Sequence, residues 1–248
     1  MGTPVIVEGL RTPIGRRDGS LARSHVSSIL GHVQKAILER TGVAPLDIGQ
    51  LVGGCVTQVG EQAFNVTRMA WLAAGLPYEV GALTIDCQCG SSQHANHLVH
   101  NMILAGVVDA GIACGVESMS RVAIGANMRN GPGDPKPDDF PYDMPNRFVA
   151  AERVAEKYGL TRVDTDAYGL ASHTRAQAAV ASGMYDFEIT PIAVPVDVQS
   201  ADGATRLFSR DEGPRRTTME RMAAIPPVLA RKRYHACPIG GHQERRPK

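Results

Sequence analysis

The sequence predicts an α/β fold in which helices cover a mainly parallel sheet. In the first half of the chain, short β-branched or apolar runs alternate with longer stretches whose apolar residues recur at helical spacing. Strands separated by amphipathic helices form βαβ units, whose crossovers are right-handed. We therefore expect a layered α/β domain in this half.

Four strands are expected there, at residues 4–9, 51–56, 82–86 and 107–114. Three helices are expected between them. The first has an apolar stripe and a stop at Gly42; the stripe consists of Val26, Ile29, Leu30, Val33, Ala36 and Ile37. The second covers 64–76 and ends at Gly75 and Pro77. The third covers 91–104, and its stripe consists of Ala95, Leu98, Val99, Met102 and Ile103.

The character of the sequence changes near Ser120. Residues 130–145 carry many prolines, glycines and aspartates and are expected to form a loop. A helix is expected over 147–158, ending at Gly159. A second begins at a capping box formed by Thr161 and Asp164 and runs to about residue 183. Residues 188–196 are expected to be extended.

Composition excludes several classes of function. The chain has 248 residues, of which 43% are hydrophobic and 21% are charged, and its net charge is +1. Nucleic-acid and membrane-surface partners need a concentrated basic field, which this balance does not provide. No apolar run is long enough to span a bilayer, and the first residues lack the pattern of a signal peptide. We expect a cytoplasmic protein without nucleic-acid or membrane partners.

The cysteines indicate reduced thiols. There are five of them, at scattered spacing: Cys55, Cys87, Cys89, Cys114 and Cys237. An odd number without a signal peptide is typical of a reducing compartment. No two have the two-residue separation usual for zinc ligands, so no metal is expected. Cys55, Cys87 and Cys114 are expected within strands, the first and last as core residues.

Cys89 is the candidate nucleophile. It lies where the expected strand 82–86 leads into the expected helix 91–104, and the positive end of a helix dipole stabilises a thiolate. Gly90 is expected to let the backbone turn tightly and to expose the sulfur. Free N–H groups of the first helical turn can also hold an oxyanion. From the residues alone, a small buried cysteine stays the alternative.

Several segments resemble the thiolase family in collinear order over about residues 4–229. DCQCGSSQHANHL, from Asp86, resembles the active-site segment. The stretch containing RTPIG resembles the family's N-terminus, and residues 53–77 resemble a segment with an Asn-x-x-Arg element, here Asn65 and Arg68. Three further matched residues, in a Gly-x-Glu-x-Met-Ser motif, are Glu117, Met119 and Ser120. Residues 150–179 resemble helices of the family's loop domain.

The resemblance implies a thiolase fold of two similar layered halves with an inserted loop domain that binds coenzyme A. This sequence would hold the N-terminal half at 1–121 and the loop domain at 122–229, with the C-terminal half missing. The resemblance also implies that Cys89, with backbone support at Gly90, accepts an acyl group from acyl-CoA. Claisen condensation or thiolytic cleavage of a 3-ketoacyl-CoA would follow. It implies no metal or cofactor beyond coenzyme A thioesters, and a homo-oligomer for the complete protein.

Two departures from the family pattern stand out. Where the family has His-Met-Gly, this chain has Asn146, Arg147 and Phe148, which resembles thiolases that act on bulky acyl-CoAs, including steroid-degrading actinobacterial ones. The Gly-His-Pro and Cys-x-Gly-Gly-Gly motifs, which supply the activating histidine and a second cysteine, do not occur in the sequence. Residues 230–248 form an atypical basic tail, whose Cys237 and His242 are not expected to replace them.

Three alternatives follow from these departures. The chain is an active thiolase, a truncated and inactive fragment that at most binds coenzyme A esters or a partner subunit, or another condensing enzyme such as a ketoacyl synthase. The RTPIG segment and the loop domain argue against the last.

Three histidines of the third helix, His94, His97 and His100, are expected to be surface or packing residues rather than metal ligands.

Overall fold

The computed structural model describes residues 3–129, 133–196 and 204–229. The chain forms two compact units: unit 1 comprises residues 1–137 and 179–214, and unit 2 comprises residues 138–178 and 215–248. This division by contacts differs from the predicted boundary after residue 121, because residues 122–137 and 179–214 pack with the first unit. The assignment of 1–121 and 122–229 as functional domains stays a prediction, and the tail 230–248 lies outside the described residues.

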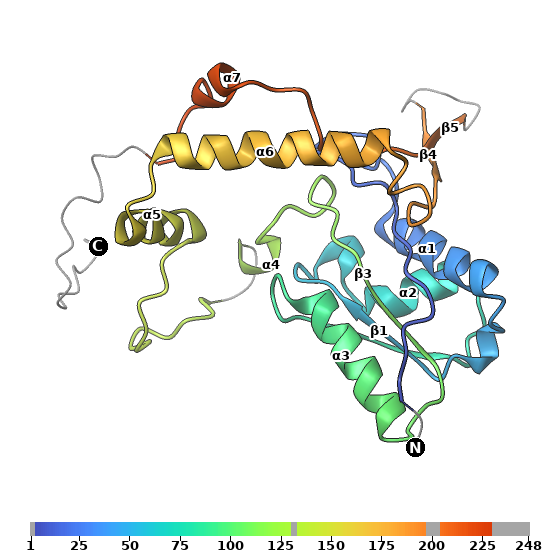
Figure 1. The fold of residues 1–248 in the computed structure, drawn as a ribbon. Helices are drawn as coiled ribbons and strands as arrows, with labels where there is room; N and C mark the ends of the chain where they lie inside the picture. The colour runs from blue at the N-terminus through green and yellow to red at the C-terminus, as the bar shows by residue number, and fades with distance from the viewer. Residues whose placement is uncertain (1–2, 130–132, 197–203, 230–248) are drawn as a thin grey trace. The chain divides into compact units, whose positions relative to one another are not determined.

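Unit 1 is built on a three-stranded parallel sheet (Figure 1). Its strands, in the spatial order β2-β1-β3, are β1 (Gln50–Gly54), β2 (Gly81–Ile85) and β3 (Gly111–Gly115). In the central strand, Leu51 lies beside Ala82 on one side and Ile112 on the other. Three of the four predicted strands therefore form, and they pair in parallel as expected. Strand β3 starts later than predicted because residues 107–110 lie in the connection between α3 and β3.

Three helices cover the two faces of this sheet: α1 (Val26–Thr41), α2 (Val66–Ala73) and α3 (Ser91–Leu104). Leu51 packs in one buried cluster with Leu38 of α1 and Trp71 of α2. Its neighbour Val52 packs in another cluster with Ala95 of α3. Successive residues of a strand face opposite sides of a sheet. Helices α1 and α2 therefore cover one face and α3 covers the other, which confirms the predicted layered α/β arrangement.

The helix ends follow the local signals in most places. Gly42 ends α1 in the left-handed conformation, with φ of 70°, and α3 has the predicted bounds. Helix α2 is shorter than predicted because Phe64 and Asn65 both have φ of 57°, so the helix starts at Val66. The Asn65 side chain caps it and accepts a hydrogen bond from the Thr84 hydroxyl of β2 at 2.8 Å. The remaining short helices of unit 1 are η1 (Pro45–Asp47), η2 (Gly60–Gln62) and α4 (Ala126–Arg129).

The predicted strand at residues 4–9 does not form. Within the described part of the chain this segment pairs with no strand, and the side chains of Val5, Ile6 and Val7 are 74%, 87% and 76% exposed. A strand is defined by hydrogen bonds to a neighbouring backbone, and β-branched composition cannot supply that neighbour. The prediction was therefore wrong for this segment.

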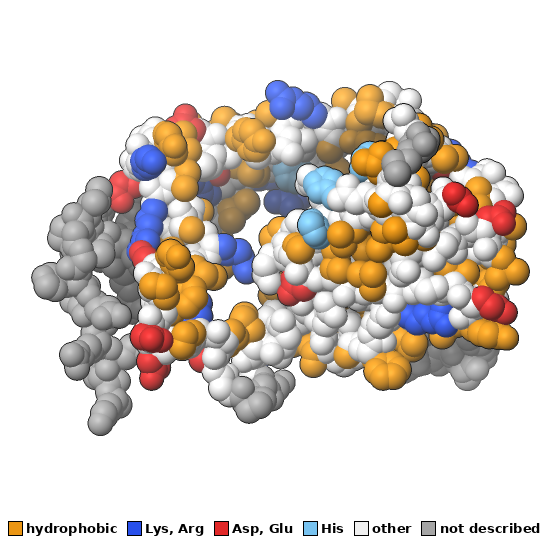
Figure 2. Space-filling view, turned by 90° about the horizontal axis from the view of Figure 1, so that it is seen from below, with side chains coloured by type: hydrophobic (Ala, Val, Ile, Leu, Met, Phe, Trp, Pro, Cys, Tyr) orange, Lys and Arg blue, Asp and Glu red, His pale blue; other side chains and the backbone are white. Residues whose placement is uncertain are grey.

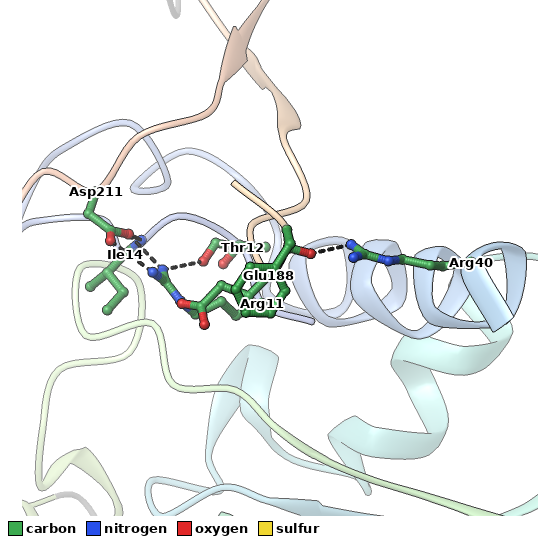
Figure 3. A network of polar contacts seen from close by, with 7 residues as sticks. Arg11, Thr12, Ile14, Arg40, Glu188 and Asp211 are labelled. Carbon is green, nitrogen blue, oxygen red and sulfur yellow. Dashed lines mark hydrogen bonds and ion pairs between the residues drawn. The ribbon is translucent and has the colours of Figure 1, made fainter. Parts of the chain in front are cut away.

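Arg11 anchors the N-terminal segment to distant parts of unit 1 (Figure 3). Its guanidinium donates to both carboxylate oxygens of Asp211, at 2.8 and 3.0 Å, and to Glu188 at 2.7 Å. It also lies 5.3 Å from the centroid of the Tyr185 ring. The Asp211 carboxylate accepts a further hydrogen bond from the backbone N–H of Ile14 at 2.7 Å. A bidentate pair of this kind fixes both position and orientation.

Protonation of Asp211 is expected to weaken the folded state. Burial by itself would raise the pKa of Asp211, but the hydrogen bonds from Arg11 and Ile14 favour the carboxylate more, and the pKa lies below its ordinary value. In the unfolded chain an aspartate titrates near pH 3.9. The stabilisation from this pair is therefore present above about pH 4 and is lost as the pH falls through the lower pKa of the folded state.

Asp211→Asn tests this linkage. At pH 7 we expect the free energy of unfolding to fall by roughly 1–3 kcal/mol, because the side chain is only 7% exposed and Arg11 would keep Glu188 but lose the second of its two charged partners. Urea titrations between pH 7 and pH 3 should also show a weaker loss of stability with acid in the variant than in the wild type. Asp109→Asn, at an exposed position, is the matched control and should change neither quantity. An unchanged acid dependence in Asp211→Asn would contradict the assignment.

A two-stranded antiparallel sheet completes unit 1. It consists of β4 (Ile192–Pro195) and β5 (Thr205–Phe208). Buried side chains from both strands pack with Ile29 of α1; they are Ile192, Val194 and Phe208. The predicted extended segment 188–196 thus contains β4, but its pairing with β5 and its cover over α1 were not predicted.

Unit 2 is helical. Its elements are α5 (Arg147–Tyr158), α6 (Arg162–Ala181), of which the last three residues belong to unit 1, and α7 (Met219–Ala223). The predicted capping box at the start of α6 is confirmed, since Asp164 accepts from the Thr161 N–H at 2.8 Å and the Thr161 hydroxyl accepts from the Asp164 N–H at 3.2 Å. Arg162 donates to the carbonyl of Met222 at 2.6 Å and so ties α7 to α6. Residues 133–145 contain no helix or strand, as predicted.

Asn146 has a structural role in unit 2. Its side-chain oxygen accepts from the N–H groups of Phe148 and Val149, at 3.0 and 3.1 Å, and so caps α5. Asparagine is among the best N-cap residues. The departure from the family's His-Met-Gly pattern therefore places a strong cap at the start of this helix.

Candidate active site

Cys89 lies on the turn that joins β2 to α3, as the sequence predicts. Strand β2 ends at Ile85 and helix α3 begins at Ser91, so four residues and Gly90 make the connection. The Cys89 thiol is exposed. The first turn of α3 contains no acidic residue that would oppose an anion at the helix N-terminus.

Hydrogen bonds from two side chains hold the turn. The Ser91 hydroxyl accepts from the Cys87 N–H at 2.9 Å and donates to the Gln88 carbonyl at 2.6 Å. Asp86 accepts from the Gln88 N–H at 2.7 Å. Gln88 has φ of 52°, a left-handed conformation that side-chain-bearing residues seldom adopt. The residue directly before Cys89 is thus held in a costly conformation from both sides.

Gly90 does not have the conformational role that the sequence suggested. Its φ of −90° is open to any residue, and a Cβ there would lie 3.4 Å from the Cys87 carbonyl, an ordinary contact. The left-handed residue of the turn is Gln88. The Gly90 N–H donates to the Cys87 carbonyl at 3.2 Å, and the Ser91 N–H donates to the Gln88 carbonyl at 3.0 Å. Both amides are therefore already bonded, and the proposed oxyanion support at Gly90 stays a prediction.

Two glycines at the ends of neighbouring strands form the seat of α3. A Cβ at Gly54, the last residue of β1, would lie 2.6 Å from the Ser92 nitrogen and 2.8 Å from the Ser91 carbonyl carbon. A Cβ at Gly115, the last residue of β3, would meet the Ser92 hydroxyl and would lie 2.9 Å from the Gly54 carbonyl oxygen. The first turn of α3 therefore rests directly on the sheet backbone, which fixes the position of Cys89.

The other described cysteines are less suited to nucleophilic chemistry. Burial, together with the nearby Glu117 carboxylate, raises the pKa of Cys55 to about 12. Burial raises the pKa of Cys114 to about 11. Cys55 is a core residue, as predicted, and Cys114 packs against the core cluster. Cys87 is exposed and follows β2 rather than lying within it, which corrects the prediction for that residue. Cys237 lies outside the described residues.

The histidines of α3 are surface residues. His94, His97 and His100 are all exposed, as expected, and the rings of the first two lie 6.2 Å apart, edge to face. Figure 2 shows histidine side chains at the surface among apolar and uncharged atoms. In residues 3–129, 133–196 and 204–229, no three His, Cys, Asp or Glu side chains gather as metal ligands. In the same ranges, no helix is long and apolar enough to cross a membrane.

A cavity of about 840 Å³ lies in unit 1 between the N-terminal segment, α1 and β3. Its walls include Arg11, Gln34, Cys114 and Glu117 but not Cys89. The space is therefore separate from the turn that carries the candidate nucleophile.

The matched motifs have structural roles that sequence reasoning did not identify. Asn65 donates to the Ala82 carbonyl at 2.9 Å, and Arg68 donates to the carbonyls of Tyr78 and Val80, so the Asn-x-x-Arg element joins α2 to the segment that leads into β2. The Ser120 hydroxyl accepts from the Asp18 N–H at 3.0 Å, which links two of the matched segments. Met119 is exposed.

Comparison with known proteins places this site in context. A family model described as the thiolase N-terminal domain matches residues 4–232. A steroid 3-ketoacyl-CoA thiolase, FadA6, of Mycobacterium tuberculosis is 34% identical over 240 residues, covering 90% of this chain and 55% of that protein. A 3-ketoacyl-CoA thiolase of Colwellia psychrerythraea is 36% identical, covering 92% of this chain and 58% of that protein.

A solved structure agrees with these relatives. The crystal structure of the Bacillus anthracis acetyl-CoA acetyltransferase superposes with a TM-score of 0.75 at 29% identity, covering 91% of this chain and 59% of that one. The chain thus spans a little over half the length of the relatives it matches. On the family match, the shared fold and the collinear motifs, this chain belongs to the thiolase family, of which it carries the N-terminal domain.

Proposed function

We propose that Cys89 accepts an acyl group from an acyl-CoA, as the first half-reaction of a thiolase. The thiolate sulfur attacks the thioester carbonyl carbon, the carbon–sulfur bond to coenzyme A breaks, and coenzyme A leaves as a thiolate that takes up a proton. The product is an S-acyl cysteine. The observation that carries the proposal is the exposed Cys89 thiol at the N-terminus of α3 in a chain of the thiolase family.

The substrate class follows from the relatives. Their names include 3-ketoacyl-CoA thiolase, steroid 3-ketoacyl-CoA thiolase and acetyl-CoA acetyltransferase. We therefore propose acyl-CoA substrates, with thiolytic cleavage of a 3-ketoacyl-CoA or Claisen condensation of acetyl-CoA as the overall reaction. Binding of coenzyme A by residues 122–229, cytoplasmic location and assembly into a homo-oligomer stay predictions.

A second candidate is a fragment that binds coenzyme A esters or a partner subunit without turnover. This alternative arises because the chain matches only 55% and 58% of the length of two thiolase relatives. A cysteine nucleophile without its base loses most of its activation. Acylation of Cys89 and release of the acyl group to a second thiol are separate steps, so they distinguish the two candidates.

Incubation of the chain with acetyl-CoA, followed by peptide mass spectrometry, tests the proposal. We expect one acetyl group on Cys89, retained in Cys87→Ala and lost completely in Cys89→Ala. Cys87 is the matched control because it is also exposed and lies two residues away. If Cys89 acquires no acetyl group while circular dichroism shows an intact fold, the acyl-acceptor function fails. If it is acetylated but does not pass the group to free coenzyme A, the fragment without turnover is the better description.

A further inference from the structure

Glu117 holds two loops together at the carboxyl end of the sheet. It follows β3, and its carboxylate accepts hydrogen bonds from the N–H groups of Val56, at 2.9 Å, and Thr57, at 3.2 Å, in the loop after β1. The side-chain amide of Gln62 donates to the same carboxylate at 3.0 Å. Among the described residues, the ion pairs include none with Glu117, so this carboxylate serves as an acceptor for neutral donors.

Gln62 closes the connection from the other side. It is fully buried, and its side-chain N–H₂ also donates to the Thr57 carbonyl at 2.8 Å. Its side-chain oxygen accepts from the Ser118 N–H at 2.8 Å. We call Glu117 and Gln62, with the backbone groups they bind, the loop clamp. Every bond of the clamp joins the loop after β1 to the loop after β3 or closes one of them on itself.

The loop clamp follows directly after the ends of β1 and β3, which support the N-terminus of α3. Gly54 and Gly115 end β1 and β3 and support the first turn of α3. The Val116 N–H donates to the Gly54 carbonyl at 3.1 Å, and the Cys55 N–H donates to the Ile85 carbonyl at 3.1 Å, just before the Cys89 turn. If the clamp loosens, the two strand ends can separate, and the surface under Ser91 and Ser92 changes shape.

We propose that Glu117 is a positioning residue for Cys89: its acceptor-only carboxylate locks the two strand ends on which the N-terminus of α3 rests. The proposal rests on the proposed acyl-acceptor role of Cys89 for its functional meaning. It does not require contact between Glu117 and the substrate. Glu117 acts through the backbone of the two loops.

The chemistry of the clamp gives an ordering of variants that simple packing would not give. Each oxygen of Glu117 accepts from an N–H, Oε2 from Val56 and Oε1 from Thr57 and Gln62. Glutamine has almost the same shape, but either orientation of its amide turns an N–H₂ donor toward one of these donors. Aspartate is shorter yet keeps two acceptors. If Glu117 acts by accepting hydrogen bonds, Glu117→Asp should be less harmful than Glu117→Gln. If it acts by filling space, Glu117→Gln should be less harmful.

The experiment measures the rate of alkylation of Cys89 by iodoacetamide, with Cys87 of the same molecule as internal reference, by peptide mass spectrometry. In Glu117→Gln we expect the Cys89 rate, relative to Cys87, to fall about tenfold, because the first turn of α3 shifts on the strand ends and displaces the Cys89 sulfur. Glu117→Asp should recover most of the loss, to within about threefold of the wild type. Glu61→Gln removes a carboxylate from the same loop that pairs with Arg121 at the surface, and it should change nothing.

Far-ultraviolet circular dichroism reports whether each variant is folded. If Glu117→Gln fails to fold, Gln62→Met removes one donor of the clamp, and a smaller fall in the same direction is expected. Two outcomes would overturn the proposal. One is an unchanged ratio of the Cys89 to the Cys87 alkylation rate in a folded Glu117→Gln variant. The other is a ratio that Glu117→Gln retains and Glu117→Asp lowers. Iodoacetamide needs no coenzyme A site. If acetyl-CoA does not acetylate the wild-type chain, the proposed function fails. The positioning role of Glu117 is still tested separately by the alkylation rates.

Discussion

Trp71→Ala is expected to lower the free energy of unfolding by roughly 3–5 kcal/mol, which is the cost of replacing a buried large aromatic side chain by alanine. Trp71 is fully buried at the point where α2 meets the sheet. It shares a buried cluster with Leu38 of α1, Leu51 of β1 and Ile112 of β3. Removing the ring takes contacts from three elements at once and leaves a cavity that a rigid sheet cannot fill.

The polar edge of the ring adds to the cost. The indole N–H donates to the Pro77 carbonyl at 2.7 Å and so ties α2 to the segment that leads into β2. Alanine leaves that carbonyl without this donor. Typical domains have only about 5–15 kcal/mol of stability, so Trp71→Ala should bring unit 1 close to unfolding at 25 °C.

Urea titration followed by far-ultraviolet circular dichroism gives the measurement, because Trp71 is the only tryptophan and its fluorescence is lost in the variant. Leu72→Ala is the matched control on the same helix. Leu72 is 37% exposed, and its replacement should cost less than about 1 kcal/mol. Equal effects of the two substitutions would show that α2 does not pack on the sheet as described.

Local signals in the sequence predicted the helices better than the sheet. The spacing of apolar residues in α3, Gly159 at the end of α5, and the Thr161–Asp164 capping box each predicted a boundary that the structure confirms. Helix periodicity and capping depend on residues within a few positions of each other. Sequence alone can therefore reveal them.

Features that depend on a distant partner were missed. The segment 4–9 has the composition of a strand, but no strand of the described residues lies beside it, and the pairing of β4 with β5 could not be read from either strand. The turn at Cys89 shows the same division. Its position between strand and helix was predicted, whereas the left-handed Gln88 and the bond from Ser91 to the Cys87 N–H were not.

The seat under α3 could not be predicted for the same reason. Gly53 and Gly54 are adjacent in a predicted strand and so are expected on opposite faces, but nothing local tells which helix packs against each face. In the fold, a Cβ at Gly53 would lie 2.8 Å from the Thr67 methyl carbon of α2, whereas one at Gly54 would meet the backbone of Ser91 and Ser92. This alternation along β1 makes the two glycines a matched pair for separating stability from the position of Cys89.

Gly54→Ala is expected to slow acetylation of Cys89 by acetyl-CoA on the order of a hundredfold. The new methyl group would lie 2.6 Å from the Ser92 nitrogen, and a backbone atom cannot turn aside as the end of a side chain can. The first turn of α3 must therefore move, and Cys89 moves with it. A displacement of about 1 Å at a reacting group can cost this much in rate. Overpacking should also reduce the free energy of unfolding by about 1–3 kcal/mol.

Gly53→Ala separates the two effects. It introduces the same methyl group one residue earlier on the opposite face, so we expect a similar loss of stability with acetylation of Cys89 retained. Gly213→Ala, at an exposed glycine with open space around its Cα, should leave acetylation unchanged and raise the free energy of unfolding by about 0.4–1 kcal/mol, which is the effect of alanine on the unfolded chain. Acetylation rates from mass spectrometry and unfolding midpoints in urea, measured for all three variants, decide the matter. If Gly53→Ala and Gly54→Ala slow acetylation equally, the sheet supports α3 only through general stability, and β1 does not position the nucleophile.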